Sequence, residues 1–215
     1  MTGILRYVLA ICALALPGVA AAHPHIYVET GLRVVTGEGG RIEGVEVTWR
    51  YDEFYSLLVL EDMELDGDYD GKLTAEELAR LDGFDMQWVE GYEGDLYASE
   101  AGDKLSLGKP EPRGTEFADG KITTRHYRAV DFGGHPDGGP VVLKAYDPGF
   151  YTAYDLNLGV DVPEGCEVAI HRADIGEAQK KLLDELAQIP VDEDSDYPEV
   201  GETFADAVEV TCAGS

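Results

Sequence analysis

Basic residues are scarce in this chain of 215 residues: 16 Lys and Arg stand against 43 Asp and Glu, which gives a formal net charge of −27. Nucleic acids and anionic membrane surfaces attract basic proteins, so the charge argues against both as partners. The same charge attracts divalent cations, but it also keeps a protein soluble in salty surroundings. Composition alone does not separate these two uses.

Motifs of catalysis are missing as well. The sequence contains no G-x-S-x-G nucleophile elbow, no H-E-x-x-H zinc motif and no glycine loop of the kind that holds phosphate. We therefore expect a protein that is not an enzyme.

Long apolar runs are absent except at the N-terminus. Arg6 precedes an apolar segment at residues 7–16, and small residues follow at 18–22. This order is typical of a secretion signal, and the apolar segment is too short to span a bilayer. We expect residues 1–22 to be removed and residues 23–215 to form one domain, periplasmic or secreted, without stable membrane insertion.

Cysteines are few, and Cys12 lies in the expected signal. Cys166 and Cys212 remain in the mature chain. An exported protein is in an oxidising compartment, where a single pair of cysteines most often forms a disulfide. A metal site made of two thiolates is the alternative, but the neighbouring sequence offers only His171 as a further ligand.

Residues 66–77 fill the positions of an EF-hand calcium loop. Gly71 takes the sixth position, where the turn is too sharp for a Cβ. The expected ligands are the side chains of Asp66, Asp68, Asp70 and Glu77, the backbone carbonyl of Lys72 and, through a water molecule, Thr74. The alternative is an acidic turn that only caps a helix. No second loop of this kind occurs, so we expect a structural Ca²⁺ site with a Kd of about 10⁻⁴ to 10⁻³ M.

Apolar periodicity predicts one helix before this loop and one after it, within about 52–91. The sides expected to face the core are Phe54, Leu57, Leu58 and Leu65 before the loop and Leu78, Leu81 and Trp88 after it. Elsewhere, alternating or short apolar runs predict strands at 26–35, 42–50, 95–99, 104–107, 122–130, 141–146, 152–160, 166–171 and 207–212. Asp174 and Glu177 predict the start of a C-terminal helix. The expected fold is α+β, an antiparallel sheet or sandwich with an inserted EF-hand-like helix-loop-helix and a C-terminal helix.

Two histidines would stand at the mature N-terminus. His23 and His25, together with a new α-amine, offer nitrogen donors that suit Zn²⁺, Ni²⁺ or Co²⁺ better than Ca²⁺. His126 and Asp147 are candidates for a third ligand, although a buried histidine and a turn aspartate are more common uses of such residues. The alternatives for the terminus are two solvated histidines or a copper brace.

Several segments resemble a bacterial periplasmic family called domain of unknown function 1007. The segments are HPHIYVE at 23–29, VTWRYDEFY at 47–55, LED at 60–62, DGDYDGKLT at 66–74 and YDPGFY at 146–151. The resemblance implies a periplasmic component of zinc, nickel or cobalt transport that works beside an inner-membrane permease. It also implies that His23 and His25 are metal contacts.

The resulting expectation is a calcium-stabilised accessory protein that carries Zn²⁺, or Ni²⁺ or Co²⁺, to or from an inner-membrane metal permease. The alternative is a calcium-dependent structural or adhesion module with no transported cargo. The two differ in whether replacing the N-terminal histidines changes any metal affinity.

Overall fold

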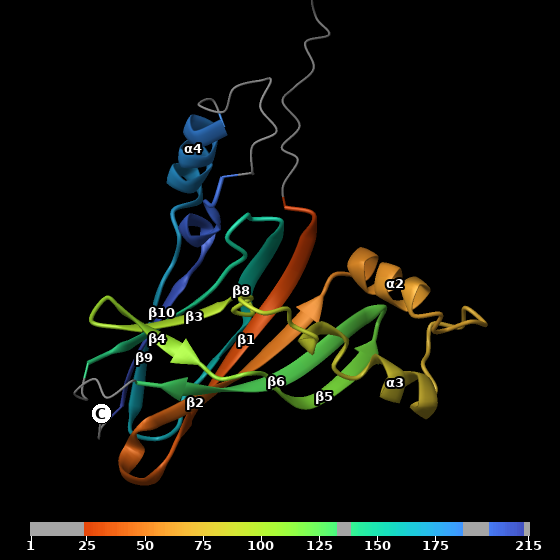
Figure 1. Cartoon of the computed structure of the whole chain (residues 1–215), viewed down its shortest axis with the longest axis horizontal. Helices are drawn as coiled ribbons and strands as arrows, with labels where there is room; N and C mark the ends of the chain where they lie inside the picture. Colours follow the sequence, from red (N-terminus) through yellow and green to blue (C-terminus); the bar gives the residue numbers. More distant parts are fainter. Residues whose placement is uncertain (1–23, 133–138, 187–197, 213–215) are drawn as a thin grey trace, which may run out of the picture.

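The computed structural model describes residues 24–132, 139–186 and 198–212, which form a strongly curved sheet with helices at its ends (Figure 1). The expected signal at 1–22 and His23 lie outside the described residues. The strands are β1 Ile26–Thr36, β2 Ile42–Tyr51, β3 Leu96–Glu100, β4 Asp103–Leu107, β5 Glu111–Ala118, β6 Lys121–Asp131, β7 Val141–Ala145, β8 Thr152–Asp161, β9 Cys166–His171 and β10 Ala207–Cys212. The α-helices are α2 Glu53–Asp62, α3 Ala75–Leu81 and α4 Ile175–Leu186, and short 3₁₀ turns occur at η1 Glu38–Gly40, η2 Phe84–Met86 and η3 Gly201–Phe204.

The α+β class is confirmed, but the expectation of a purely antiparallel sheet is wrong. The strands form one mixed sheet in the order β8-β1-β2-β6-β4-β3-β7-β10-β9, with β5 also paired to β6. β1 and β8 run parallel, with Ile26 opposite Thr152 and Leu32 opposite Val160. The other pairs are antiparallel. A parallel pair needs a long connection, and this one contains the calcium-loop insertion and β3–β7.

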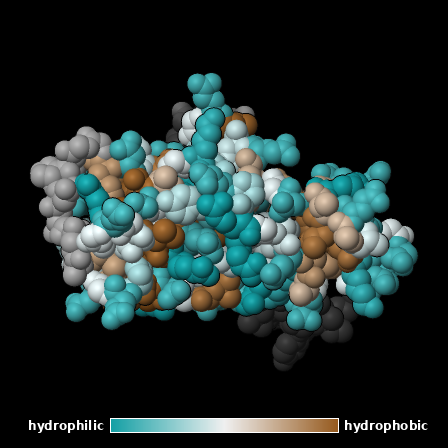
Figure 2. Space-filling model, turned by 90° about the horizontal axis from the view of Figure 1, so that it is seen from below, coloured by the Kyte–Doolittle hydropathy of each residue, from teal (hydrophilic) through white to brown (hydrophobic). Residues whose placement is uncertain are grey.

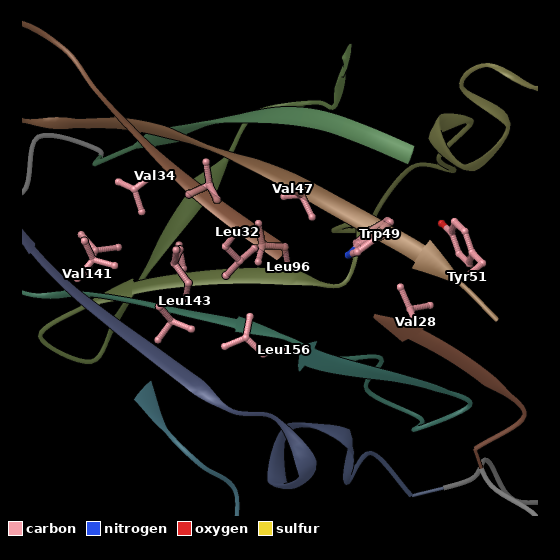
Figure 3. Packing of buried hydrophobic residues seen from close by; sticks show 14 of the residues in the cluster. Val28, Leu32, Val34, Val47, Trp49, Tyr51, Leu96, Val141, Leu143 and Leu156 are labelled. Atoms are coloured by element: carbon pink, nitrogen blue, oxygen red, sulfur yellow. The ribbon is translucent and has the colours of Figure 1, made fainter. Parts of the chain in front are cut away.

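The core lies inside the bend of the sheet. Leu32 and Trp49 from the β1–β2 side and Leu143 and Leu156 from β7 and β8 point toward one another (Figure 3). Alternate residues of each strand are buried, as a half-buried sheet requires. The sheet therefore curls almost into a barrel whose interior is filled by side chains.

β5 is the strand that the sequence pattern missed. It contains Pro112 and Gly114, and its register against β6 shifts between these two residues. Most of its side chains are exposed or half-buried. Proline and glycine are tolerated in an edge strand with a bulge, but they remove the apolar alternation by which a strand is recognised.

α2 turns a different side to the core than the periodicity predicted. Ser56 and Leu60 are its buried residues, whereas Phe54, Leu57 and Leu58 are exposed. Apolar residues occur on every side of this helix, so periodicity alone could not select the packed side. Two contacts decide the orientation: Tyr27 N donates to Asp52 Oδ2 at 2.9 Å, and Ile122 N donates to Ser56 Oγ at 3.0 Å.

The expected disulfide is present. Cys166 and Cys212 lie opposite each other in the β9–β10 pair and are bonded. Because β9 pairs only with β10 among the described strands, the disulfide fastens an edge strand to the sheet.

Within the described ranges, no helix is long and apolar enough to cross a membrane.

Candidate functional site

The loop between α2 and α3 brings three carboxylates together. One oxygen from each of Asp66, Asp68 and Asp70 lies within 4.8 Å of the others, and within the described part of the chain this is the one such group of three potential metal-binding side chains. Three oxygens converging at an exposed loop match the hard-ligand preference of Ca²⁺. The loop is at the tip of the molecule, beyond the ends of the two helices (Figure 1).

The backbone of the loop is folded around Asp66. Asp70 N and Gly71 N donate to the two carboxylate oxygens of Asp66 at 3.1 and 3.2 Å. Gly71 has a φ of 74°, which a residue with a Cβ adopts only with strain. Glycine at the sixth loop position is thus explained by the observed turn.

Glu77, the last residue of the loop, is not part of the group of three aspartates. Its Oε1 accepts from Asp66 N at 3.0 Å, and its Oε2 accepts from Thr74 N and Thr74 Oγ1 at 2.8 and 2.7 Å. The hydrogen bonds from Thr74 lower the pKa of Glu77, so this half-buried residue keeps its carboxylate ionised. Glu77 therefore joins the start of the loop to its end and caps α3, as a capping box does.

Both ends of the helix-loop-helix are attached to the sheet. Asp52 and Ser56 hold α2, as described above. After α3, Thr115 Oγ1 of β5 donates to Asp82 Oδ1 at 2.7 Å, and Asp85 Oδ2 accepts from Tyr51 of β2 and Thr124 of β6 at 2.8 and 2.6 Å. A cation in the loop would consequently stiffen an element that contacts four strands.

His25 is exposed at the start of β1, far along the chain from the turn that it contacts. Its backbone N donates to Tyr151 O at 2.8 Å, and its ring lies 4.7 Å from that of Tyr151, centroid to centroid. The parallel pairing of β1 with β8 produces this contact. The structure therefore puts His25 beside the turn at 146–151.

Asp147 lies in that turn and organises it. Its Oδ1 accepts from Gly149 N at 3.0 Å, and its Oδ2 accepts from Tyr151 N and Thr152 N at 2.9 and 3.0 Å. Tyr151 contacts both residues, so Asp147 and His25 belong to the same corner of the molecule. Asp147 is primarily a turn residue and stays a candidate third ligand.

His126 lies too far from the N-terminal corner to be a third ligand there. It is fully buried in β6, opposite Val47, which in turn lies opposite Leu32. Leu32 is six residues beyond the start of β1, so the imidazole is about 20 Å along the strand from the N-terminal corner. Its ring packs against Trp49 and Trp88, with centroids 4.8 and 6.1 Å away.

Further polar groups are buried in the core together with His126, and no pattern in the sequence predicted them. Both His126 nitrogens, Thr30 Oγ1 and Trp49 Nε1 are buried and have no hydrogen-bond partner among the residues that the structure describes. Burial and the nearby Arg128 lower the pKa of His126 to about 4. Asp95, which accepts from Tyr154 OH at 2.8 Å, has its pKa raised to about 6 by burial. The core thus keeps a neutral imidazole and a carboxyl group that resists ionisation.

No curated protein matches the sequence. The sequence model of the family described as "Protein of unknown function (DUF1007)" matches residues 8–212. This match includes the calcium-type loop, the turn at 146–151 and both cysteines of the disulfide, and the chain therefore belongs to the DUF1007 family.

Proposed function

We propose that this protein is an exported, calcium-stabilised accessory protein of divalent transition-metal transport. Ca²⁺ would occupy the loop at 66–77, and Zn²⁺, or Ni²⁺ or Co²⁺, would bind at the N-terminal corner for transfer to or from an inner-membrane metal permease. The convergence of Asp66, Asp68 and Asp70 is the observation that carries the calcium part of this proposal.

The site for Ca²⁺ is suited to a resident ion. Asp66, Asp68 and Asp70 supply oxygen, Glu77 is ionised next to them, and Lys72 and Thr74 complete the expected ligand set. The ion would stabilise structure rather than take part in a reaction, because the start of α2 and the segment after α3 are both hydrogen-bonded to the sheet. Export to a calcium-rich, oxidising compartment is supported by the Cys166–Cys212 disulfide.

The cargo site is suited to easy release. His25 is exposed, and His23 would add a second imidazole close by. Two or three neutral donors at a surface hold Zn²⁺ less firmly than a closed site with four ligands. Histidine binds Zn²⁺ through neutral imidazole, so protons compete with the metal at such a site.

A zinc titration tests the cargo proposal. The mature protein, secreted so that its natural N-terminus is intact, is titrated with Zn²⁺ by calorimetry with Ca²⁺ saturating. We expect one site, and we expect His23→Ala/His25→Ala to weaken it at least about tenfold because two nitrogen ligands are lost.

The matched control is His171→Ala, which removes an exposed imidazole of β9 that interacts with Glu209. This variant should bind Zn²⁺ like the wild type. If the double variant titrates like the wild type, or if no Zn²⁺ binds, the cargo proposal is wrong and the calcium-dependent structural module is the better description.

A further inference from the structure

The outer side of α2 is apolar although nothing among the described residues covers it. Phe54, Leu57 and Leu58 are 66%, 49% and 44% exposed. They occupy positions i, i+3 and i+4 and so form one stripe along the helix. A helix that is apolar on every side is normally covered on every side. In α2, however, the buried residues are only Ser56 and Leu60, which face the sheet.

Two exposed aromatic side chains occur near the start of α2, at the N-terminal corner. Tyr27 and Tyr151 are 51% and 50% exposed. Tyr27 N donates to Asp52 Oδ2, and Asp52 begins α2, so the two elements are in direct contact. We call Phe54, Leu57, Leu58, Tyr27 and Tyr151 the α2 surface. Figure 2 shows the molecule from below, and hydrophobic residues are exposed beside hydrophilic ones on this face too, at the end that carries α2 and α3.

The chain segment that carries α2 is acidic. Residues 51–65, which exclude the expected Ca²⁺ ligands, include five acidic residues and no basic residue. Arg80 of α3 is the basic side chain that reaches the end of this segment, where it donates to Met63 O. Glu61 and Asp62 directly continue the apolar stripe at the end of α2, and Glu53 lies at its start. An apolar strip bordered by carboxylates is complementary to a segment that is apolar on one side and basic on the other.

A second copy of this chain would fit poorly. It would bring two acidic borders together, and like charges across an interface oppose association. From the stripe and its border we propose that the α2 surface docks an amphipathic, helix-forming segment of a partner protein, with Lys or Arg on its polar side. Docking there does not depend on the proposed zinc site, although it would bring the partner next to His25.

The test uses two synthetic peptides of about 18 residues that contain Leu and Lys in equal numbers. In the first, Leu falls on one side of a helix; in the second, the same residues are ordered so that Leu is spread around it. Binding to the mature protein is measured by fluorescence anisotropy at physiological salt with Ca²⁺ saturating. The two peptides have the same charge, so nonspecific attraction to an acidic protein affects both equally.

We expect the first peptide to bind at least about tenfold more tightly than the second. The variant Phe54→Ser/Leu57→Ser/Leu58→Ser should lose this preference, and Phe54→Ser alone should reduce it. Because these side chains are exposed, circular dichroism should show an unchanged fold. Val168→Ser/Ile170→Ser, which alters exposed apolar residues of β9, should keep the preference.

Equal binding of the two peptides would overturn the proposal, as would a triple variant that binds like the wild type. A concentration-dependent dimer that the triple variant abolishes would also overturn it, because the α2 surface would then be an interface between copies.

Discussion

Replacing Cys166 and Cys212 with Ala should lower the free energy of unfolding by about 4 kcal/mol. The two residues are separated by 46 positions, and the disulfide lowers the conformational entropy of the unfolded chain by closing that loop. The loss should be concentrated at the edge of the sheet. β9 has exposed or half-buried side chains, so few apolar contacts hold it to β10 without the bond.

Urea unfolding of the oxidised protein, the reduced protein and the double Ala variant measures this effect. Reductant should destabilise the wild type and leave the variant unchanged. Hydrogen exchange should show that the amides of β9 and β10 lose protection before those of β1 and β2. A difference between oxidised and reduced protein of less than about 1 kcal/mol would contradict the loop-entropy explanation.

Replacing His126 with Phe should change how stability depends on pH. The folded protein keeps His126 neutral down to a pKa of about 4, whereas a histidine in the unfolded chain takes up a proton near the ordinary imidazole pKa of 6.5. The unfolded state therefore binds more protons between these values, and stability is lost as the pH falls through this window. The difference corresponds to about 3 kcal/mol.

Asp95 has the opposite effect over nearly the same range. Its folded-state pKa is raised from 3.8 to about 6, so the folded protein retains a proton that the unfolded chain has released. Its contribution is present below the unfolded value and is lost as the pH rises through about 6, again by about 3 kcal/mol. The contributions of His126 and Asp95 should nearly cancel in the wild type.

Single variants separate the two contributions. Relative to wild type, His126→Phe should gain stability as the pH falls from 7 to 4, and Asp95→Asn should gain stability as the pH rises over the same range. Asn retains an oxygen that can accept from Tyr154, so the packing is preserved. Urea unfolding at several pH values measures both. Parallel curves for the wild type and either variant would show that the residue concerned does not have the shifted pKa.

Local patterns were sufficient for most of the strands and for the calcium-type loop. The calcium-type loop at 66–77 was recognisable because Gly71 and the three aspartates lie in one short segment and belong to the same turn. The disulfide was also predictable, because the expected export signal left only Cys166 and Cys212. In each case the information lies within a short segment or in a composition too sparse to allow alternatives.

Long-range pairing was not predictable. The parallel contact of β1 with β8 joins segments more than a hundred residues apart, and no local pattern indicates that His25 meets the turn of Asp147. The packed side of α2 was missed because the choice depends on tertiary contacts through Asp52 and Ser56. His126 lies on the buried side of β6, and a polar residue there breaks the pattern from which burial is inferred.

A calcium titration of the mature protein tests the central claim most directly. Calorimetry and thermal unfolding are compared for the wild type, Glu77→Gln and Glu76→Gln. Gln at position 77 can still cap α3 but cannot bind Ca²⁺ through two charged oxygens, and Glu76 is an exposed neighbour in the same helical turn. We predict one Ca²⁺ per chain with a Kd of about 10⁻⁴ to 10⁻³ M and a stabilisation of about 1 kcal/mol at millimolar Ca²⁺, both retained in Glu76→Gln. Binding should weaken at least about tenfold in Glu77→Gln. No binding to the wild type, or an equal response of the two variants, would contradict a calcium site at residues 66–77.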